Sequence, residues 1–432
     1  MSSILTNNGA MVALQTLKSI NTNLGKTQDM ISTGKSVSSA KDNAAIWAIS
    51  KVMESDFNGF KAIRSSLALG QSTVSVARQA SERVTDLLTQ MKEKIVASQE
   101  ENVDRAKIQT DIAALRDQIT GITSASQFNG LNLLSNRSTQ AGTGTVNILA
   151  SLDRSSSAVN ASEIAVRKQD LGTTVSAITG ATWTIGTAVN SGTLNATRTA
   201  TVNAATPSAA GQVFGLSIFG TDADNSSFDQ ATFRTGAAAT PANIAEATAI
   251  RYISRDGDTA ADVAKGLANA FKIFAAQNNM SDNVLSIEAS GNGLSIRSNV
   301  TTATDTISVG IFNPQAGAGS SATIGGGLEA LNSINVSTAA GASAALTSIE
   351  FMIDTAITSA ASFGSAQGRI STQADFVSQM SDALRAGIGT LVDADMEEAS
   401  ARLQALQVQQ QLGIQSLSIA NQAPQSILSL FR

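Results

Sequence analysis

Two short segments of the sequence have the residue types of a phosphate-binding loop. They are Gly25–Thr27 (GKT) and Gly34–Ser36 (GKS), where a lysine and backbone amides could hold the phosphates of a nucleotide. Such a loop also needs a glycine five residues before the glycine that precedes the lysine, and Ile20 and Asp29 occupy those positions. The two segments therefore do not predict a nucleotide-binding site.

Asp393 and Asp395 form a pair of carboxylates that could act as general acid and base. The surrounding sequence indicates no partner base, and we interpret the pair as a solvated hinge. The chain contains no histidine and no cysteine, which excludes His-dependent triads, disulfides and metal sites built from imidazole or thiolate. The sequence thus predicts a protein that is not an enzyme and that uses no cofactor and no metal ion.

The composition excludes further classes of protein. The 432 residues carry a net charge of −5 and only 15% are charged, so no basic surface for nucleic acid is expected. No run of about 18 apolar residues occurs, and we expect no membrane insertion. Residues 1–15 lack a basic leader followed by an apolar core, so they do not resemble a conventional secretory signal.

The elements that could position any site are long helices with heptad repeats. From Ile349 onward, apolar residues recur every seven positions, which asks for a partner helix with a matching stripe. A helix of about 45 residues would be roughly 70 Å long, too long for the centre of one compact globule. The members of this late stripe are Ile349, Ala356, Phe363, Ile370, Val377, Leu384 and Leu391.

A matching stripe lies early in the chain. One heptad phase consists of Ile46, Met53, Phe60, Leu67, Val74, Leu88 and Ile95, interrupted by Ser81, and the other contains Ile49, Ile63, Ala77, Val84 and Met91. A third, shorter stripe consists of Ile108, Ile112, Leu115, Ile119 and Ile122. Stripes from both ends can share one bundle only if the chain leaves the bundle after the early helices and returns to it for the late one. We therefore predict a mainly α fold, a long antiparallel helical bundle or coiled coil built by both chain ends, with the middle inserted.

The outermost segments predict a second pair of helices. The first, capped by Ser2 or Ser3, would end at Gly34 and present a seam of Asn7, Ala10, Leu14, Leu17, Asn21, Leu24, Gln28 and Ile31. A weak surface helix is the alternative for this segment. In the last segment, Met396, Ala399, Leu403 and Leu406 form one stripe, whereas Val408, Leu412 and Ile419 lie off it. Apolar groups on two faces imply more than one neighbour.

We expect these end segments to become ordered when neighbouring copies cover their apolar faces. The predicted polymer interface consists of Leu14, Leu17, Leu24, Ile31, Leu403, Leu406, Leu412, Leu417, Leu428 and Phe431. The predicted division is an inner coiled-coil domain of residues 1–35 and 396–432, and a helical-bundle core domain of residues 36–170 and 326–395. An outer domain of residues 171–325 is inserted between the two parts of the core.

The inserted region has a different residue pattern. After Leu134 the sequence is rich in Ala, Ser, Thr, Asn and Gly, and the apolar period falls from 3.6 to 2. A hairpin of 146–149 with 164–167 should belong to the bundle domain. Further strands are predicted at 183–185, 213–219, 249–253, 284–288, 294–297 and 307–311, with one helix beginning after Asp258. The insert is thus predicted to be an α+β, β-rich module, and disorder is the alternative.

Three motifs resemble those of bacterial flagellins. The N-terminal signature is matched by 14–24, by 28–34 (QDMISTG) and by 39–45 (SAKDNAA). The segment 128–134 (FNGLNLL) is similar to the end of the early helical region, and 420–432 (ANQAPQSILSLFR) to the C-terminal signature. A weaker similarity to a repeat of flagellin and hook-protein inserts lies at Gly257–Val263.

The resemblance implies a structural subunit of the extracellular flagellar filament, which assembles with itself for swimming. It also implies unfolded export through the flagellar type III apparatus, a chaperone, contacts with cap and hook-associated proteins, and mixing with other flagellins. The alternatives are a hook–filament junction protein and an adhesive or enzymatic surface filament, whose binding chemistry would lie in Leu171–Gly325. Some flagellins carry a zinc peptidase in the insert, which the lack of histidine excludes here.

The resemblance also concerns two segments that host immune receptors recognise in flagellins. The one that matches Gln28–Trp47 departs from the common pattern at Asn43, Ile46 and Trp47. The second candidate region is Gln90, Met91, Lys92 and Glu93, with Gln90 where strongly recognised members carry arginine. We expect weak recognition by toll-like receptors.

Overall fold

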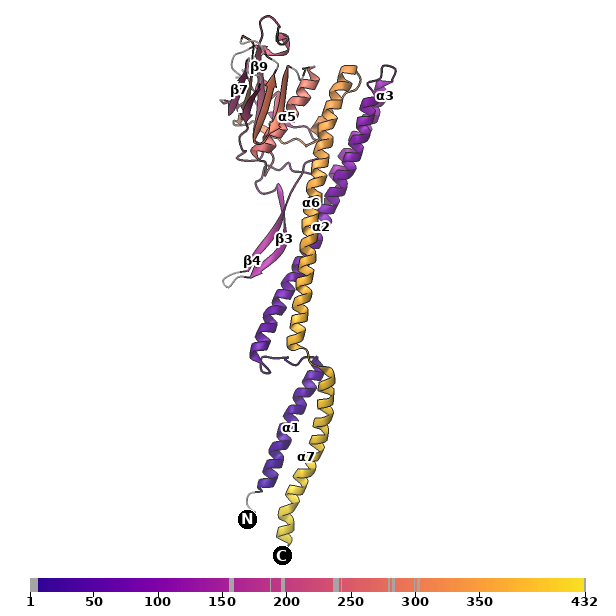
Figure 1. Ribbon diagram of the computed structural model, residues 1–432, viewed down its shortest axis with the longest axis vertical. Coiled ribbons are helices and arrows are strands. Elements are labelled where there is room, and N and C mark those ends of the chain that lie inside the picture. Colours follow the sequence, from indigo (N-terminus) through magenta and orange to yellow (C-terminus); the bar gives the residue numbers. More distant parts are fainter. Residues whose placement is uncertain are drawn as a thin grey trace. The chain divides into compact units, whose positions relative to one another are not determined.

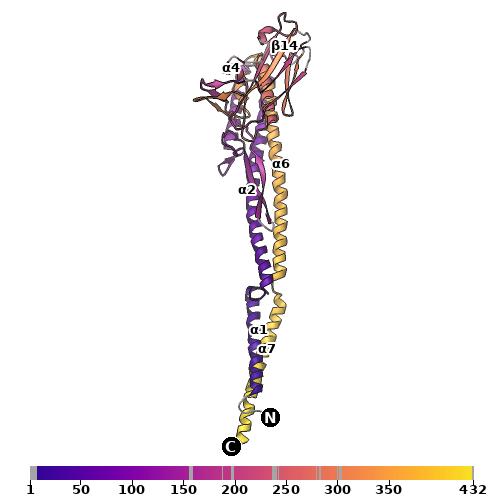
Figure 2. The same cartoon turned by 90° about the vertical axis from the view of Figure 1, so that its left-hand side faces the viewer.

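The computed structural model describes residues 7–154, 159–186, 188–195, 199–235, 241, 243–278, 280–281, 284–298, 300 and 304–430. The chain forms two compact units, one of Met1–Ser65, Ser151–Asn160 and Ala374–Arg432, the other of Ser66–Ala150 and Ala161–Gln373. Helices α2 (Ala44–Ala97) and α6 (Ala339–Val392) contribute to both units, which are described separately below. The predicted fold class, mainly helical with a β-rich insertion, is confirmed (Figures 1 and 2).

In the first unit, helix α1 (Asn8–Thr33) lies antiparallel beside helix α7 (Met396–Leu430), as both views show. The N-cap of α1 is Asn7, whose side-chain oxygen accepts from the amide of Ala10 at 3.1 Å. The predicted cap residues Ser2 and Ser3 lie outside the described part of the chain. Gly34 ends the helix with φ of 69°, the left-handed conformation expected of it.

The joint between α6 and α7 is built from backbone hydrogen bonds. Lys35 and Asp393 form an antiparallel bridge, and the amide of Ala394 donates to the carbonyl of Gly34 at 3.0 Å. Asp395 caps α7, because its carboxylate accepts from the amides of Glu397 at 2.9 Å and Glu398 at 3.2 Å. Asp393 and Asp395 thus have structural roles at a corner, in line with their interpretation as a hinge.

In the second unit, helix α3 (Arg105–Ala125) packs beside parts of α2 and α6 (Figure 1). Salt bridges join the helices: Lys92 of α2 pairs with Glu350 of α6, and Lys94 of α2 pairs with Asp111 of α3 at 2.7 Å. The heptad positions buried in this unit are Leu67, Val74, Ala77, Val84, Leu88, Met91, Ile95, Ile349, Ala356, Phe363 and Ile370. Ser81, the polar interruption, is buried as well, and its hydroxyl donates to the carbonyl of Ala77 at 2.8 Å.

The bundle positions in the first unit are less shielded. Val377 is buried, whereas Ile46, Met53, Phe60 and Leu384 are half-buried. Ile49, expected in the second heptad phase, is exposed at 53%, so its predicted burial is wrong. Ile63 of the same phase is fully buried, so burial along the stripe falls toward the start of α2.

Two hairpins adjoin the bundle. Strands β1 (Gln127–Phe128) and β2 (Leu131–Asn132) are joined through Asn129 and Gly130, whose φ angles of 51° and 79° suit a tight two-residue turn. Strands β3 (Thr145–Arg154) and β4 (Val159–Arg167) form the predicted longer hairpin. A Cβ atom on Gly70 would lie 2.6 Å from Ile148, so glycine lets β3 approach α2 closely.

The inserted region contains two main sheets. The five-stranded sheet has the order β10-β9-β14-β7, with β11 also paired to β9, and the three-stranded sheet has the order β12-β13-β8. Their bounds are β7 Asn190–Leu194, β8 Thr199–Asn203, β9 Val213–Thr221, β10 Arg234–Thr235, β11 Ile250–Ile253, β12 Leu285–Ser290, β13 Gly293–Ser298 and β14 Thr306–Phe312. Two small two-stranded sheets pair β5 (Ala177–Thr179) with β16 (Ser321–Thr323) and β6 (Trp183–Thr184) with β15 (Gln315–Ala316).

Helix α5 (Ala260–Gln277) contributes to one core with both main sheets (Figure 1). Thr259 and Asp262 form a capping box, which fixes the start of this helix. Val263, Leu267 and Phe271 then turn toward the strands and are at most 1% exposed. Short helical segments α4 (Ile244–Ala247), η1 (Gln230–Thr232) and η2 (Glu329–Ser333) complete the fold. Among the described residues, none of the helices is both long and apolar enough to cross a bilayer.

Candidate functional site: the paired terminal helices

The α1–α7 pair has a continuous seam with alternating steps of three and four residues. On α1 the seam consists of Ala10, Ala13, Leu17, Ile20, Leu24, Thr27 and Ile31, all half-buried or buried. On α7 it consists of Ala399, Leu403, Leu406, Gln410, Gly413, Leu417 and Ala420. The predicted phase of Leu14, Asn21 and Gln28 is wrong as a seam, because Ala13, Ile20 and Thr27 take those places. Such spacing is that of an antiparallel coiled coil.

A glycine allows the two helices to approach at the middle of the seam. A Cβ atom on Gly413 would lie 2.9 Å from Cδ1 of Leu17 and 3.8 Å from Cδ1 of Ile20. The large side chains of α1 therefore fill the space that a side chain on Gly413 would need.

Two side-chain amides link the helices at the edges of the seam. The Nδ2 group of Asn7 donates to the carbonyl of Ala420 at 2.8 Å, and the Nε2 group of Gln410 donates to Oδ1 of Asn21 at 2.8 Å. Both contacts require the same antiparallel alignment, since a slip by one turn would break both. The polar residues of the predicted phase thus fix register from the edge of the seam.

Away from the seam, α7 carries a second apolar stripe that no described part of the chain covers. Val408, Leu412 and Ile419 are 55%, 57% and 68% exposed, and they lie roughly on the opposite side of the helix at 100° per residue. Between Leu403 and Leu430 the helix contains no Asp, Glu, Lys or Arg. A solvated helix face normally carries charges, so this uncharged stripe is a candidate contact surface.

Helix α1 also exposes apolar residues. Met11, Val12 and Leu14 are each more than half exposed, and none of them is a seam position. These three residues with Val408, Leu412 and Ile419 are called the outer apolar surface below.

The predicted polymer-interface residues divide between the seam and this surface. Leu406 is buried against α1, and Leu17, Leu24, Ile31, Leu403 and Leu417 are half-buried in the seam. Leu14 and Leu412 face outward. The side chain of Leu428 and all of Phe431 fall outside the described part of the structure. Sequence reasoning omitted Met11 and Val12 from this surface, although their apolar character in an N-terminal amphipathic helix was available as a signal.

The immune-receptor candidate region lies on α2. Gln90 and Glu93 are exposed, and Lys92 is paired with Glu350. Met91 is fully buried, so a receptor could not contact its side chain in this conformation.

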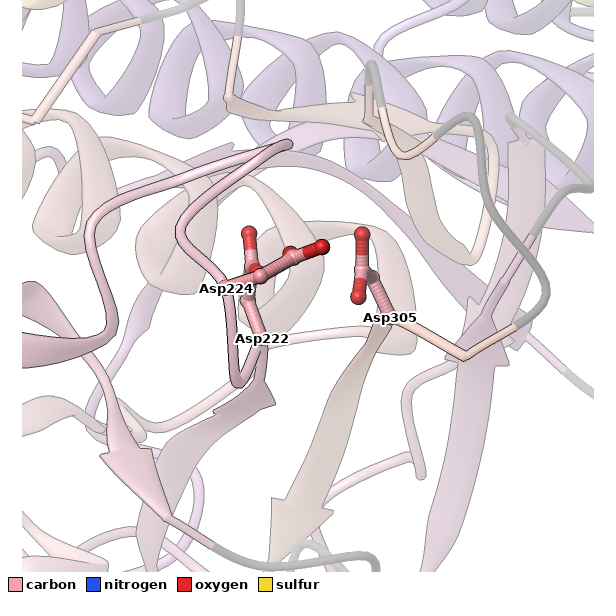
Figure 3. Close-up of side chains that lie close together, drawn as sticks. All are labelled: Asp222, Asp224 and Asp305. Carbon is pink, nitrogen blue, oxygen red and sulfur yellow. The ribbon is translucent and has the colours of Figure 1, made fainter.

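A carboxylate cluster in the inserted module is the strongest arrangement for metal chemistry among the described residues. Oxygen atoms of Asp222, Asp224 and Asp305 lie within 4.8 Å of one another, and the three carboxylates converge (Figure 3). Asp222 is buried and accepts from the amides of Ser227 and Phe228, both at 2.8 Å. Burial raises the pKa of Asp222, but these amides outweigh it and hold the pKa at about 2. The hydrogen bonds close loop 222–228 and occupy oxygens that a cation would need.

A cavity of about 620 Å³ lies in the second unit, with α5 and α6 among its walls. Several of its charged groups are paired: Arg167 contacts Asp258 at 2.7 Å, and the hydroxyl of Tyr252 donates to the same carboxylate at 2.6 Å. Burial raises the pKa of the Tyr252 hydroxyl above its usual range. These contacts favour a structural cluster over an acid–base pair.

Comparison with known proteins shows similarity to bacterial flagellins over both helical ends and over the full length. The bacterial flagellin N-terminal helical region matches residues 4–139, and the bacterial flagellin C-terminal helical region matches residues 346–431. The chain is 34% identical over 443 residues to Flagellin A of Rhizobium meliloti, and 34% identical over 439 residues to Flagellin B of that organism, with 100% of both proteins covered in each case.

Similarity to solved structures is more distant. The FliC structure from Burkholderia pseudomallei is 17% identical with a TM-score of 0.30, and the match covers 69% of this chain and 99% of that one. The matches to the two helical regions and to the full-length relatives show that the chain belongs to the bacterial flagellin family.

Proposed function

We propose that this protein is the structural subunit of an extracellular flagellar filament, and that subunits join through the outer apolar surface of α1 and α7. The observation that carries the proposal is the uncharged stretch Leu403–Leu430, with Val408, Leu412 and Ile419 uncovered on one side. Burying a side chain of this size contributes about 1.5–3 kcal/mol. Repetition of that contact along a filament would hold subunits together without any covalent link.

The three-part division remains part of this proposal. Residues 1–35 and 396–432 would form the inner part of the filament, residues 36–170 and 326–395 the surrounding bundle, and residues 171–325 the outer module. The function of the protein would be mechanical, namely the transmission of torque for swimming, with no catalysis.

Seeded assembly followed by electron microscopy tests the proposal. Heat-dissociated protein is added to short filament seeds, with full-length protein beside a truncation that lacks Met396–Arg432. We expect long filaments from the first and none from the second. Capping of seeds without growth by the full-length protein would support the hook–filament junction alternative instead. Growth by the truncated protein would show that the terminal pair is not the joining element.

Export through the flagellar apparatus is a further part of the proposal. The chain has no cysteine, so no disulfide would prevent unfolding, and the uncovered stripe on α7 gives a chaperone an apolar surface to bind before assembly. In cells without a functional flagellar export apparatus, the protein should be absent from the culture medium and present in the cell lysate by immunoblot. Normal amounts in the medium would contradict this route.

Contacts with cap and hook-associated proteins and mixing with other flagellins complete the proposed set of partners. Weak recognition by toll-like receptors is proposed separately, from Gln90 at an exposed position of α2. The substitution Gln90→Arg should increase the response in a cell reporter assay with purified monomer. A full response by the unmodified protein would overturn this proposal.

A further inference from the structure

The exposed methionines are concentrated on the helices that contain the terminal and joint regions. Met11 of α1 is 63% exposed and Met396 of α7 is 43% exposed, whereas Met91 and Met352 are at most 2% exposed. Met380, on α6, is exposed at 36%. A thioether is the side-chain group here that a mild oxidant can modify, because the chain has no cysteine. Its reactivity follows its exposure, so Met11 and Met396 should react first in the monomer.

We propose that Met11 and Met396 are oxidation sites through which a peroxide prevents unassembled subunits from joining a filament. The inference rests on the proposed function, since it requires the terminal helices to be the joining surface. The sulfur lone pair of the thioether attacks one oxygen of hydrogen peroxide and the O–O bond breaks. A sulfoxide forms, and the departing hydroxide takes the remaining proton as water. The sulfur loses two electrons and the peroxide oxygen gains them.

The product is poorly suited to the surface where it forms. Met11 adjoins Val12 and lies three residues from Leu14, both exposed apolar side chains. A thioether adapts to such a contact, whereas a sulfoxide is polar and needs a hydrogen-bond partner when it is buried. Burial of the unpartnered oxygen between subunits should lower the association constant roughly tenfold per site.

The same geometry gives protection after assembly. In a filament joined through the terminal helices, neighbouring subunits would cover Met11 and Met396, and peroxide would no longer reach them. Subunits would therefore be sensitive before incorporation and resistant afterwards.

The test combines peptide mass spectrometry with seeded elongation. Monomer and finished filaments of the full-length protein are treated with hydrogen peroxide, which is then removed, and sulfoxide is measured at each methionine. In the monomer, Met11 and Met396 should be oxidised well before Met91 and Met352, and treated monomer should elongate seeds at least about tenfold more slowly than untreated monomer. In filaments, both sites should be oxidised at least about tenfold more slowly than in monomer.

Substitution variants connect the lesion to its site. The double variant Met11→Leu/Met396→Leu removes both thioethers at nearly constant volume and should elongate equally well with and without peroxide. The matched control Met380→Leu removes an exposed methionine of α6 and should remain inhibited by peroxide. Rescue by Met380→Leu, or continued inhibition of the double variant, would overturn the inference.

The outcomes also separate this inference from the proposed function. Failure of untreated protein to elongate seeds would count against the proposed function itself. Normal elongation by untreated protein together with full elongation after peroxide would leave the filament function standing and refute the oxidation sites.

Discussion

In the inserted module, Val263, Leu267 and Phe271 of α5 face strands of both main sheets and are almost completely buried. In the terminal pair, α7 buries Leu406 against α1 but leaves Val408 and Leu412 in solvent. Both helices carry apolar stripes, but among the described residues those of α5 are covered by the chain itself and those of α7 are covered on one side only. The module thus has a core of its own, whereas the terminal pair leaves apolar side chains exposed that the proposed subunit contact would cover.

Charge on the outer apolar surface should produce the largest effect. The double substitution Val408→Glu/Leu412→Glu adds two carboxylates that a subunit contact would have to bury, so elongation of seeds should fall at least about 100-fold. Electron microscopy of seeded reactions measures this. Gln404→Glu/Gln411→Glu adds the same charge to the same helix outside the stripe and should reduce elongation less. Equal loss in both variants would show that net charge, and not the stripe, controls assembly.

A cavity in the core of the inserted module should lower the stability of the module without stopping filament elongation. Phe271→Ala removes a fully buried ring and should destabilise the module by about 3–5 kcal/mol, which urea unfolding of the monomer would measure. Seeded elongation should continue, because the outer apolar surface is unchanged. Phe274→Ala, on the half-buried part of the same helix, should cost less. Complete loss of elongation by Phe271→Ala would contradict the independence of the two regions.

The same contrast explains which structural elements could be predicted from the sequence. Large apolar residues at heptad spacing correctly predicted α2 and α6, and the one helix expected in the insert after Asp258 is α5. Strands β7 (NSGTL) and β8 (TATVN) were missed, because their small and polar side chains alternate in burial without a strong apolar signal. The convergence of Asp222 with Asp305 was not predictable from spacing, since the pairing of β9 with β14 brings them together.

The seam illustrates a further limit of prediction. Heptad spacing alone allowed Leu14 and Asn21 as seam residues, since they lie one position away from Ala13 and Ile20. The structure places Asn21 at the edge, where it accepts from Gln410. The shape of the partner helix decides which of two adjacent stripes faces it. Here the space above Gly413 accepts Leu17 and Ile20, and the sequence of α1 alone does not show that space.

A smaller effect should separate the two roles of Asn7. Its side-chain oxygen caps α1 through Ala10, and its nitrogen donates to Ala420 of α7. Asn7→Ala loses both contacts and should cost about 1–2 kcal/mol, whereas Asn7→Asp keeps the cap and loses only the donor. Hydrogen exchange of the first amides of α1 in the monomer measures the difference. Equal loss of protection in both variants would mean that the contact with α7 alone orders this end.

Acid should affect the module before it affects the seam. The folded-state pKa of Asp222 is lowered from 3.8 to about 2, so its charged form contributes stability that is present above pH about 4 and is lost as the pH falls toward 2. The seam positions contain no Asp or Glu and should not titrate in this range.

In Asp222→Asn, an NH₂ group replaces one of the oxygens that accept from Ser226, Ser227 and Phe228, so the variant should be less stable than the natural protein at neutral pH. Because protonation removes the same acceptor from the natural protein, the difference in urea unfolding between the two should shrink between pH 4 and pH 2. A difference that stays constant over that range would mean that the carboxylate's charge does not hold loop 222–228, and that packing around the loop does.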